Sequence, residues 1–306
     1  RDLHSLRRRQ RQMCIRDSHD IRYIKRVKKL SEKGSGYLSI DTPVFPGIFD
    51  WAITYCWASL TAVDLVSSSN YNVVFNPCGG LHHARKDSDG GFCVFNDVAL
   101  AALYLHEKRV RVAIVDIDAH AGDGTMHILY DKPILKISIH EDPHFLYPGD
   151  GFVEQVGFGD GYGYTINVPL PPGSADNILE KAFDKIVKTA LVKYSPQIII
   201  LQSGVDGYKA DPLTHLRYSA HGYRNVANTL RGLSDRIVML GGGGYSMYTH
   251  FLWATIFTTL IDEFSFIESE IMKIDPTPTK SDEYLIKQAD KVISNILNNH
   301  PFFTEI

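Results

Sequence analysis

The chain of 306 residues is long enough for one large domain or two average ones. Hydrophobic residues make up 44% of it and charged residues 22%, which excludes a mostly disordered chain. The net charge of the chain is −3. Residues 1–18 carry +4, so residues 19–306 carry −7. Because duplex DNA binders depend on basic surface, we expect no direct contact with nucleic acid.

Four cysteines without a C-x-x-C pair favour a reducing, intracellular setting. No apolar run reaches the roughly 18–20 residues that span a membrane, and the basic start lacks the apolar segment of a secretory signal. We therefore expect a cytoplasmic protein without membrane contact. We interpret residues 1–18 as a non-native or disordered basic segment, and residues 19–306 as a single domain.

Short runs rich in β-branched residues alternate with segments of helical spacing. The runs predict strands at 72–76, 110–118, 134–140, 164–168, 198–202 and 236–240. Apolar residues every three or four positions predict helices at 48–66, 96–108, 175–194, 220–233 and 248–264, and a loop at 272–282 precedes a last helix near 283–298. This alternation is typical of an α/β fold whose mostly parallel sheet is covered by helices on both faces.

Polar, glycine-rich segments follow four of the predicted strands: PCGGLHH, DIDAHAGDG, LQSGVDGY and LGGGGY. Ligands of open α/β sheets bind in the crevice beyond the carboxyl ends of the strands. The four segments therefore predict one composite site.

Asp118 and His120 are two residues apart, so in an extended segment both side chains project to the same side. Asp206, after another strand, adds a third candidate ligand. Three protein ligands and one open position are typical of a catalytic zinc site. For the D-x-H pattern alone, a helix-capping Asp and a buried structural histidine are the more common explanation, because short motifs have high false-positive rates.

His82 and His83 follow two glycines at a strand end. Adjacent histidines in extended backbone point to opposite sides, so they are better suited to proton transfer than to binding one metal. Asp116 and Asp123 flank the D-x-H motif and are candidates to orient the imidazoles. An exposed polar loop explains the two histidines equally well.

The segment 241–244 consists of four glycines and is followed by Tyr245. Four glycines permit backbone conformations closed to other residues and a close approach to a ligand. A phosphate-binding loop would need a Gly-Lys-Ser/Thr ending, which is missing. Tyr245 is either a hydrogen-bond donor of the site or a core tyrosine after a flexible turn.

In this order, the segments resemble the zinc-dependent histone deacetylase and acetoin-utilisation deacetylase family. The resemblance extends from His19 to about Leu260. The matching sequence segments include DTPVFPGIFDWA, GGLHHA, GGFCVFNDVALA, DIDAHAGDG, SIHEDPHFLYPGDG, LQSGVDGYKADPL and LGGGGYS. The resemblance implies a three-layer α/β/α arginase-deacetylase-like fold with a central, mostly parallel sheet of about eight strands. It also implies hydrolysis of an N-acetyl amide, with an acetylated lysine peptide or protein, or a small acetylated amine, as substrate.

The resemblance assigns a role to each matching residue. The ligands of Zn²⁺, or of Fe²⁺ as the alternative, would be Asp118, His120 and Asp206. The catalytic residues would be His82, His83, Asp116, Asp123 and Tyr245, with His83 as the general base. The substrate would contact Asp41, Gly91, Phe92, Tyr147 and Leu213. A structural K⁺ would take oxygens from Asp116, Asp118, His120, Ser138 and Ile139.

Three departures from the family pattern stand out. Ala121 replaces a second histidine after the ligand, Tyr147 replaces a common phenylalanine, and the first strand and loop expected before His19 are missing.

The related arginases and agmatinases use two Mn²⁺ ions and a D-A-H-x-D run, but Gly122 replaces its last Asp, so we expect one metal. Two further alternatives are an acetylpolyamine deacetylase and a non-catalytic protein that binds acyl-lysine.

Overall fold

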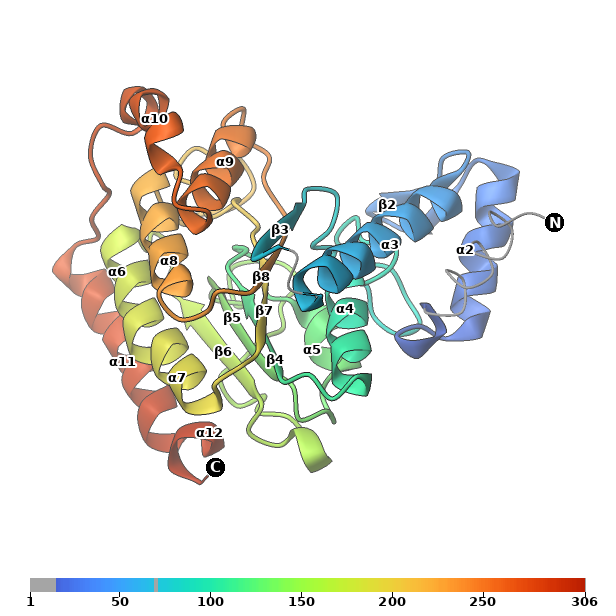
Figure 1. Ribbon diagram of the computed structural model, residues 1–306, viewed down its shortest axis with the longest axis horizontal. Coiled ribbons are helices and arrows are strands. Elements are labelled where there is room, and N and C mark those ends of the chain that lie inside the picture. Colours follow the sequence, from blue (N-terminus) through green and yellow to red (C-terminus); the bar gives the residue numbers. More distant parts are fainter. Residues whose placement is uncertain (1–14, 69–70, 306) are drawn as a thin grey trace.

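The computed structural model describes residues 15–68 and 71–305 (Figure 1). Its central sheet has six parallel strands in the order β3-β8-β7-β4-β5-β6. Their bounds are β3 (Val73–Asn76), β4 (Val112–Asp116), β5 (Leu135–Glu141), β6 (Thr165–Leu170), β7 (Ile198–Gln202) and β8 (Ile237–Leu240). A separate antiparallel pair consists of β1 (Tyr37–Ser39) and β2 (Thr42–Pro43).

Alternate residues of each central strand point to opposite faces, so the sheet separates two hydrophobic cores. In β4, Ala113 and Val115 belong to one core, whereas Val112 and Ile114 belong to the other. The first core is covered by α6 (Asp176–Ala182), the π-helix η3 (Phe183–Lys188), α7 (Thr189–Tyr194), α8 (Ala220–Arg231), α9 (Thr249–Leu260) and α11 (Glu283–Asn299). The second is covered by α3 (Ile48–Ser67), α4 (Asp97–Glu107) and α5 (Asp123–Ile128). Figure 1 shows these two layers on either side of the sheet.

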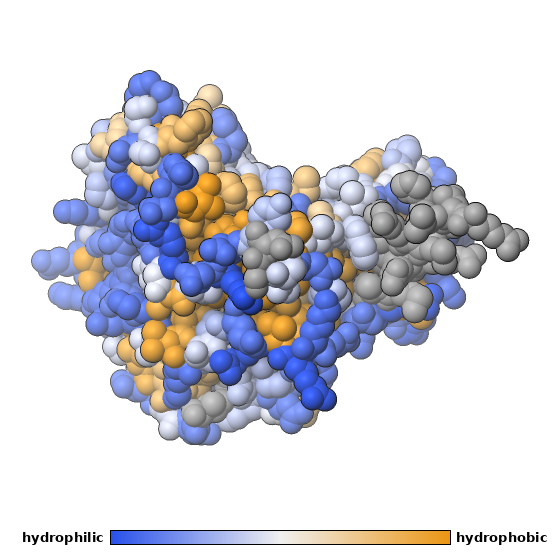
Figure 2. Space-filling view, viewed as in Figure 1, coloured by the Kyte–Doolittle hydropathy of each residue, from blue (hydrophilic) through white to orange (hydrophobic). Residues whose placement is uncertain are grey.

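Both faces of the sheet are therefore covered, which confirms the predicted α/β/α class. Figure 2 shows mostly hydrophilic residues along the left rim of this face, over α6 and α11, and hydrophobic residues nearer its middle. In the described part of the chain, no helix is long and apolar enough to cross a membrane.

All six strands predicted from the β-branched runs are present, but the sheet has six strands and not the eight that the resemblance implied. The only other described strands, β1 and β2, pair with each other and do not extend the sheet. The predicted helix at 175–194 contains the π-helical segment η3, and α10 (Glu268–Ile274) takes up the first residues of the loop predicted at 272–282. The remaining short helices are η1 (Ile15–Asp17), η2 (Gly159–Gly161), η4 (Phe264–Phe266) and α12 (Pro301–Thr304).

One longer helix was not predicted. In α2 (Ile21–Lys33), the Asp20 side chain caps the first turn by accepting a hydrogen bond from the Arg22 backbone N–H. The buried face of α2 joins a third core, which also contains Ile15, a residue with 1% of its surface exposed. The packed part of the chain thus starts before His19, and residues 1–14 lie outside the described residues.

Candidate active site

The neighbouring strands β3, β8, β7 and β4 bring the four polar segments to one edge of the sheet. The segment after β3 carries His82 and His83, and the segment after β4 carries Asp118 and His120. Asp206 follows β7. The parallel strand order therefore explains why residues far apart in the sequence meet here.

Asp118, His120 and Asp206 form a buried cluster in which one ligand atom from each residue lies within 4.8 Å of the others. His120 Nδ1 lies 2.8 Å from Asp206 Oδ2 and 3.1 Å from Asp118 Oδ1. Burial alone would lower the pKa of His120, but the two carboxylates raise it to about 11. Burial and the nearby charge of Asp118 raise the pKa of Asp206. Two buried carboxylates that converge on one imidazole nitrogen favour a cation between them, so the donor set fits a divalent metal.

Backbone and amide donors fix the two carboxylates in place. Asp118 Oδ2 accepts hydrogen bonds from Gln202 Nε2 at 2.9 Å and from the Gly243 N–H at 2.8 Å. Asp206 Oδ1 accepts one from the Ala119 N–H at 2.7 Å. A Cβ on Gly243 would lie 2.1 Å from Asp206 Oδ2. This contact explains why a glycine follows β8 here: the backbone approaches the carboxylates too closely for a side chain.

Each of the two histidines pairs with a different buried carboxylate. His82 Nδ1 lies 2.7 Å from Asp116 Oδ2, and His83 Nδ1 lies 2.7 Å from Asp123 Oδ1. Burial alone would lower the pKa of His82, but Asp116 and Asp118 raise it to about 9. Burial and the charge of His82 lower the pKa of His83 to about 4. The structure therefore contains the two predicted His–Asp pairs, with opposite shifts of the histidine pKa values.

A cavity of about 250 Å³ opens in front of these groups and is lined by Asp41, His83, Gly91, Phe92, His120, Leu146, Tyr147, Leu213 and Tyr245. All five predicted substrate-contacting residues line this outer cavity. A second, inner cavity of about 200 Å³ is also lined by His83 and His120, and in addition by His82. Of the two paired histidines, only His83 lines both cavities.

Asp211 fixes two sides of the outer cavity at once. Its Oδ2 accepts a hydrogen bond from the Tyr245 N–H at 2.8 Å, and its Oδ1 accepts one from the Leu213 N–H at 3.0 Å. Burial raises the pKa of the Tyr245 hydroxyl above its ordinary value, so the group remains a hydrogen-bond donor at neutral pH. No sequence pattern predicts a role for Asp211, although it lies five residues after Asp206.

Gly91 lies against His83 in a backbone conformation with φ of +50°. A Cβ at this position would lie 2.2 Å from His83 Cδ2. Its N–H donates a hydrogen bond to Asp41 Oδ2 at 2.9 Å. Asp41 thus holds the segment that carries Gly91 and Phe92, in addition to lining the outer cavity.

The five residues predicted for K⁺ lie around the end of β4 and on β5. Asp116 and Ser138 are register partners on these strands and line a small buried cavity of about 20 Å³. Asp118 and His120 follow β4. Ile139 is buried in the first core and does not line this small cavity.

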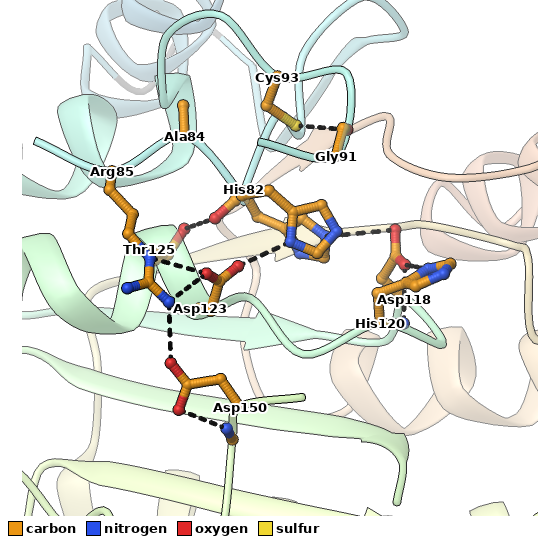
Figure 3. Close-up of polar contacts among 12 residues, drawn as sticks. His82, Ala84, Arg85, Gly91, Cys93, Asp118, His120, Asp123, Thr125 and Asp150 are labelled. Carbon is orange, nitrogen blue, oxygen red and sulfur yellow. Dashed lines mark hydrogen bonds and ion pairs between the residues drawn. The ribbon is translucent and has the colours of Figure 1, made fainter. Parts of the chain in front are cut away.

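Two polar residues near the site, one charged and one neutral, carry no signal in the sequence. Arg85 follows the two histidines and donates hydrogen bonds to Asp123 and to Asp150 (Figure 3). Gln202, the last residue of β7, donates to Asp118. A lone Arg or Gln in a sequence carries no motif, so only its neighbours in space identify it.

The chain is similar in sequence to known proteins. The histone deacetylase domain model matches residues 4–260. The acetoin utilization protein AcuC of Staphylococcus aureus (strain MRSA252) is 35% identical over 268 residues, covering 80% of this chain and 67% of that protein. AcuC of Bacillus subtilis is 34% identical, covering 88% and 71% of the two chains, and a probable deacetylase of Archaeoglobus fulgidus is 36% identical, covering 76% and 66%.

Among solved structures, the HDA15 HD domain superposes with a TM-score of 0.82 at 24% identity, covering 95% of this chain and 80% of that one. At this identity the match shows the fold alone. The sheet, the cluster of Asp118, His120 and Asp206, and the two His–Asp pairs define an α/β protein with a hydrolase-type site at its strand ends. The chain belongs to the histone deacetylase family, and this membership supports deacetylase activity.

Proposed function

We propose that the protein removes acetyl groups from N-acetyl-lysine side chains of peptides or proteins, with one divalent metal ion, Zn²⁺ or alternatively Fe²⁺, bound by Asp118, His120 and Asp206. One observation carries the proposal: the outer cavity is lined by the metal-ligand candidate His120, by His83 and by Tyr245 together. An amide that enters this cavity meets a metal site, a base and a hydroxyl donor at once.

The metal, when bound, supplies a Lewis acid that lowers the pKa of a water molecule and polarises the acetyl carbonyl. His83 has a lowered pKa and is therefore neutral at pH 7, as a general base must be. Its Nδ1 is engaged with Asp123, which leaves Nε2 to accept the proton from the attacking water and to return one to the leaving amine. Tyr245 donates a hydrogen bond to the oxygen on which negative charge develops.

The walls of the outer cavity suit the uncharged methylene stem of acetyl-lysine. Phe92, Tyr147 and Leu213 provide apolar surface, and burial of a methylene group is worth about 0.8 kcal/mol. Asp41 provides a carboxylate that can accept hydrogen bonds from the backbone N–H groups of a peptide. A polyamine has no such backbone. We also propose that K⁺ binds near Asp116 and Ser138, with the oxygens of Asp118, His120 and Ile139.

A small acetylated amine is the alternative substrate. An enzyme that selects a polyamine benefits from an acidic group near the distal ammonium, whereas the residue that follows Asp211 and Pro212 and lines the outer cavity is the apolar Leu213. This difference favours the peptide.

Turnover by the metal-loaded protein tests the proposal. We expect release of acetate from an acetyl-lysine peptide, with kcat/KM above that for N-acetylputrescine or N8-acetylspermidine. A tenfold preference for either polyamine would overturn the choice of substrate. Binding of the peptide without any acetate release from a folded, metal-loaded protein would support the non-catalytic alternative.

A further inference from the structure

The Arg85 side chain lies between two carboxylates beside the site (Figure 3). Its Nε and Nη2 atoms donate to Asp123 Oδ2 at 2.9 and 2.8 Å, and Nη2 also donates to Asp150 Oδ2 at 3.0 Å. The other oxygen of Asp123, Oδ1, lies 2.7 Å from His83 Nδ1. The two oxygens of Asp123 are thus divided between the guanidinium and the imidazole.

Asp123 is almost completely buried, since 5% of its side chain is exposed. Burial alone would raise the pKa of Asp123, but His83 and Arg85 hold it below the ordinary value. A buried carboxylate that is hydrogen-bonded through one oxygen only is free to rotate about its last bond, and it carries an unpaired oxygen. Two donors from one rigid guanidinium prevent that rotation, because the planar fork fixes both direction and distance.

Arg85 is itself held from the far side. Asp150, which also binds His127 Nε2 at 2.7 Å and Gln155 Nε2 at 2.6 Å, lies on the same loop as Tyr147. The guanidinium therefore has one anchor on the loop of the outer cavity and one on Asp123. This double attachment limits the movement of Arg85, although 40% of its side chain is exposed.

We propose that Arg85 is a positioning residue: it locks the Asp123 carboxylate in the orientation that aligns His83 for proton transfer. The inference rests on the proposed function, in which His83 is the general base. Arg85 lines neither of the two cavities, so we expect no direct contact between its side chain and a substrate bound there. Its loss is therefore expected to lower kcat and to leave KM within about threefold.

The variants Arg85→Gln, Arg85→Lys and Arg85→Ala test this role. Loss of an outer hydrogen-bond partner of a catalytic group typically costs roughly 10- to 100-fold, and we expect this loss of kcat in Arg85→Gln. Arg85→Lys restores the charge without the fork and should recover only part of it. In Arg85→Ala, guanidinium chloride at a few millimolar should raise kcat, whereas the same concentration of ammonium chloride should not.

Arg231→Gln is the matched control. Its side chain is also 40% exposed and pairs with Asp262 far from the site at the end of α8, so kcat should stay at the wild-type value. Melting temperature and metal content are measured for every variant. Wild-type kcat in Arg85→Gln, or a loss of kcat that accompanies loss of metal or fold and is not rescued by guanidinium, would overturn the proposal.

A second readout does not depend on turnover. The proton of a short histidine–carboxylate hydrogen bond resonates far downfield in NMR spectra, and we expect such a signal from His83 Nδ1–H, assigned by its absence in His83→Gln. It should disappear in Arg85→Ala and return with guanidinium. An unchanged signal would overturn the positioning role. If the wild type hydrolyses no acetylated amine, the proposed function fails, while this signal still decides whether Arg85 orders Asp123 and His83.

Discussion

The Nε2 atoms of His82 and His83 lie 3.2 Å apart. Asp116 and Asp118 raise the pKa of His82 to about 9, whereas burial and the charge of His82 lower the pKa of His83 to about 4, so the positive charge of the pair lies on His82. The two adjacent residues therefore differ in protonation at pH 7.

This difference predicts unequal effects of substitution. We expect His83→Gln to lower kcat by roughly 10²–10⁴, the usual contribution of a general base. His82→Gln should lower kcat less, because His82 does not line the outer cavity. Steady-state kinetics of both variants, loaded with the same metal, measure the two effects. A larger loss in His82→Gln would reverse the proposed assignment.

The metal site predicts a stoichiometry. The donor set of Asp118, His120 and Asp206 should hold about one divalent transition ion per chain, and replacement of any of the three by Ala should abolish binding. Elemental analysis after metal loading and desalting counts the ions. Two ions per chain would favour a binuclear site instead.

Tyr245→Phe should fold and retain the metal but lose turnover. Removal of one oxyanion donor costs roughly 2.7–4 kcal/mol, or 10²–10³ in kcat. The Asp211 hydrogen bond to the Tyr245 N–H is made by the backbone, so the phenylalanine retains its position. A kcat within threefold of the wild type would show that the hydroxyl has no catalytic role.

Leu213 predicts substrate preference. Its side chain is partly exposed at the outer cavity, so a glutamate fits there without burying its charge. Leu213→Glu should shift the ratio of kcat/KM for N8-acetylspermidine and for the peptide at least tenfold toward the polyamine. Leu213→Gln, which has the same shape without the charge, is the control. An equal shift in both variants would exclude the electrostatic explanation.

His19 predicts a pH-dependent stability. Its Nδ1 donates to the Arg85 carbonyl at 2.8 Å and its Nε2 accepts from the Asn96 N–H at 2.9 Å, so the ring must be neutral. Burial lowers its pKa to about 4 from the ordinary 6.5. Between these two pH values the unfolded chain binds more protons than the folded protein. The contribution of neutral His19 to the free energy of unfolding is therefore complete above pH 6.5 and decreases toward pH 4 by about 1.4 kcal/mol per pH unit.

Urea unfolding at pH 6.5 and pH 5 measures this dependence. The wild type should lose roughly 2 kcal/mol more than His19→Gln over the interval, since the amide does not titrate there. Equal losses in the two proteins would show that His19 does not supply the pH dependence.

The sequence predicted the sheet strands and the polar strand ends because buried β-branched runs and Gly-rich segments are local patterns. It did not predict α2, whose capping residue Asp20 lies within the segment treated as the start of the domain. Partners across space, such as Arg85 with Asp150 or Asp211 with Tyr245, depend on how loops fold back on the sheet edge. No spacing in the sequence encodes them.

The contact between Gly91 and His83 also limits how the outer cavity can be redesigned. A methyl group on Gly91 would displace the imidazole, because it would lie 2.2 Å from Cδ2. Leu213 and Tyr147 are 46% and 47% exposed, so their side chains can be exchanged without disturbing the core. A library that selects for longer acyl chains should therefore vary Leu213 and Tyr147 and keep Gly91 fixed. A substitution of Gly91 would alter the cavity and displace the general base His83 at the same time.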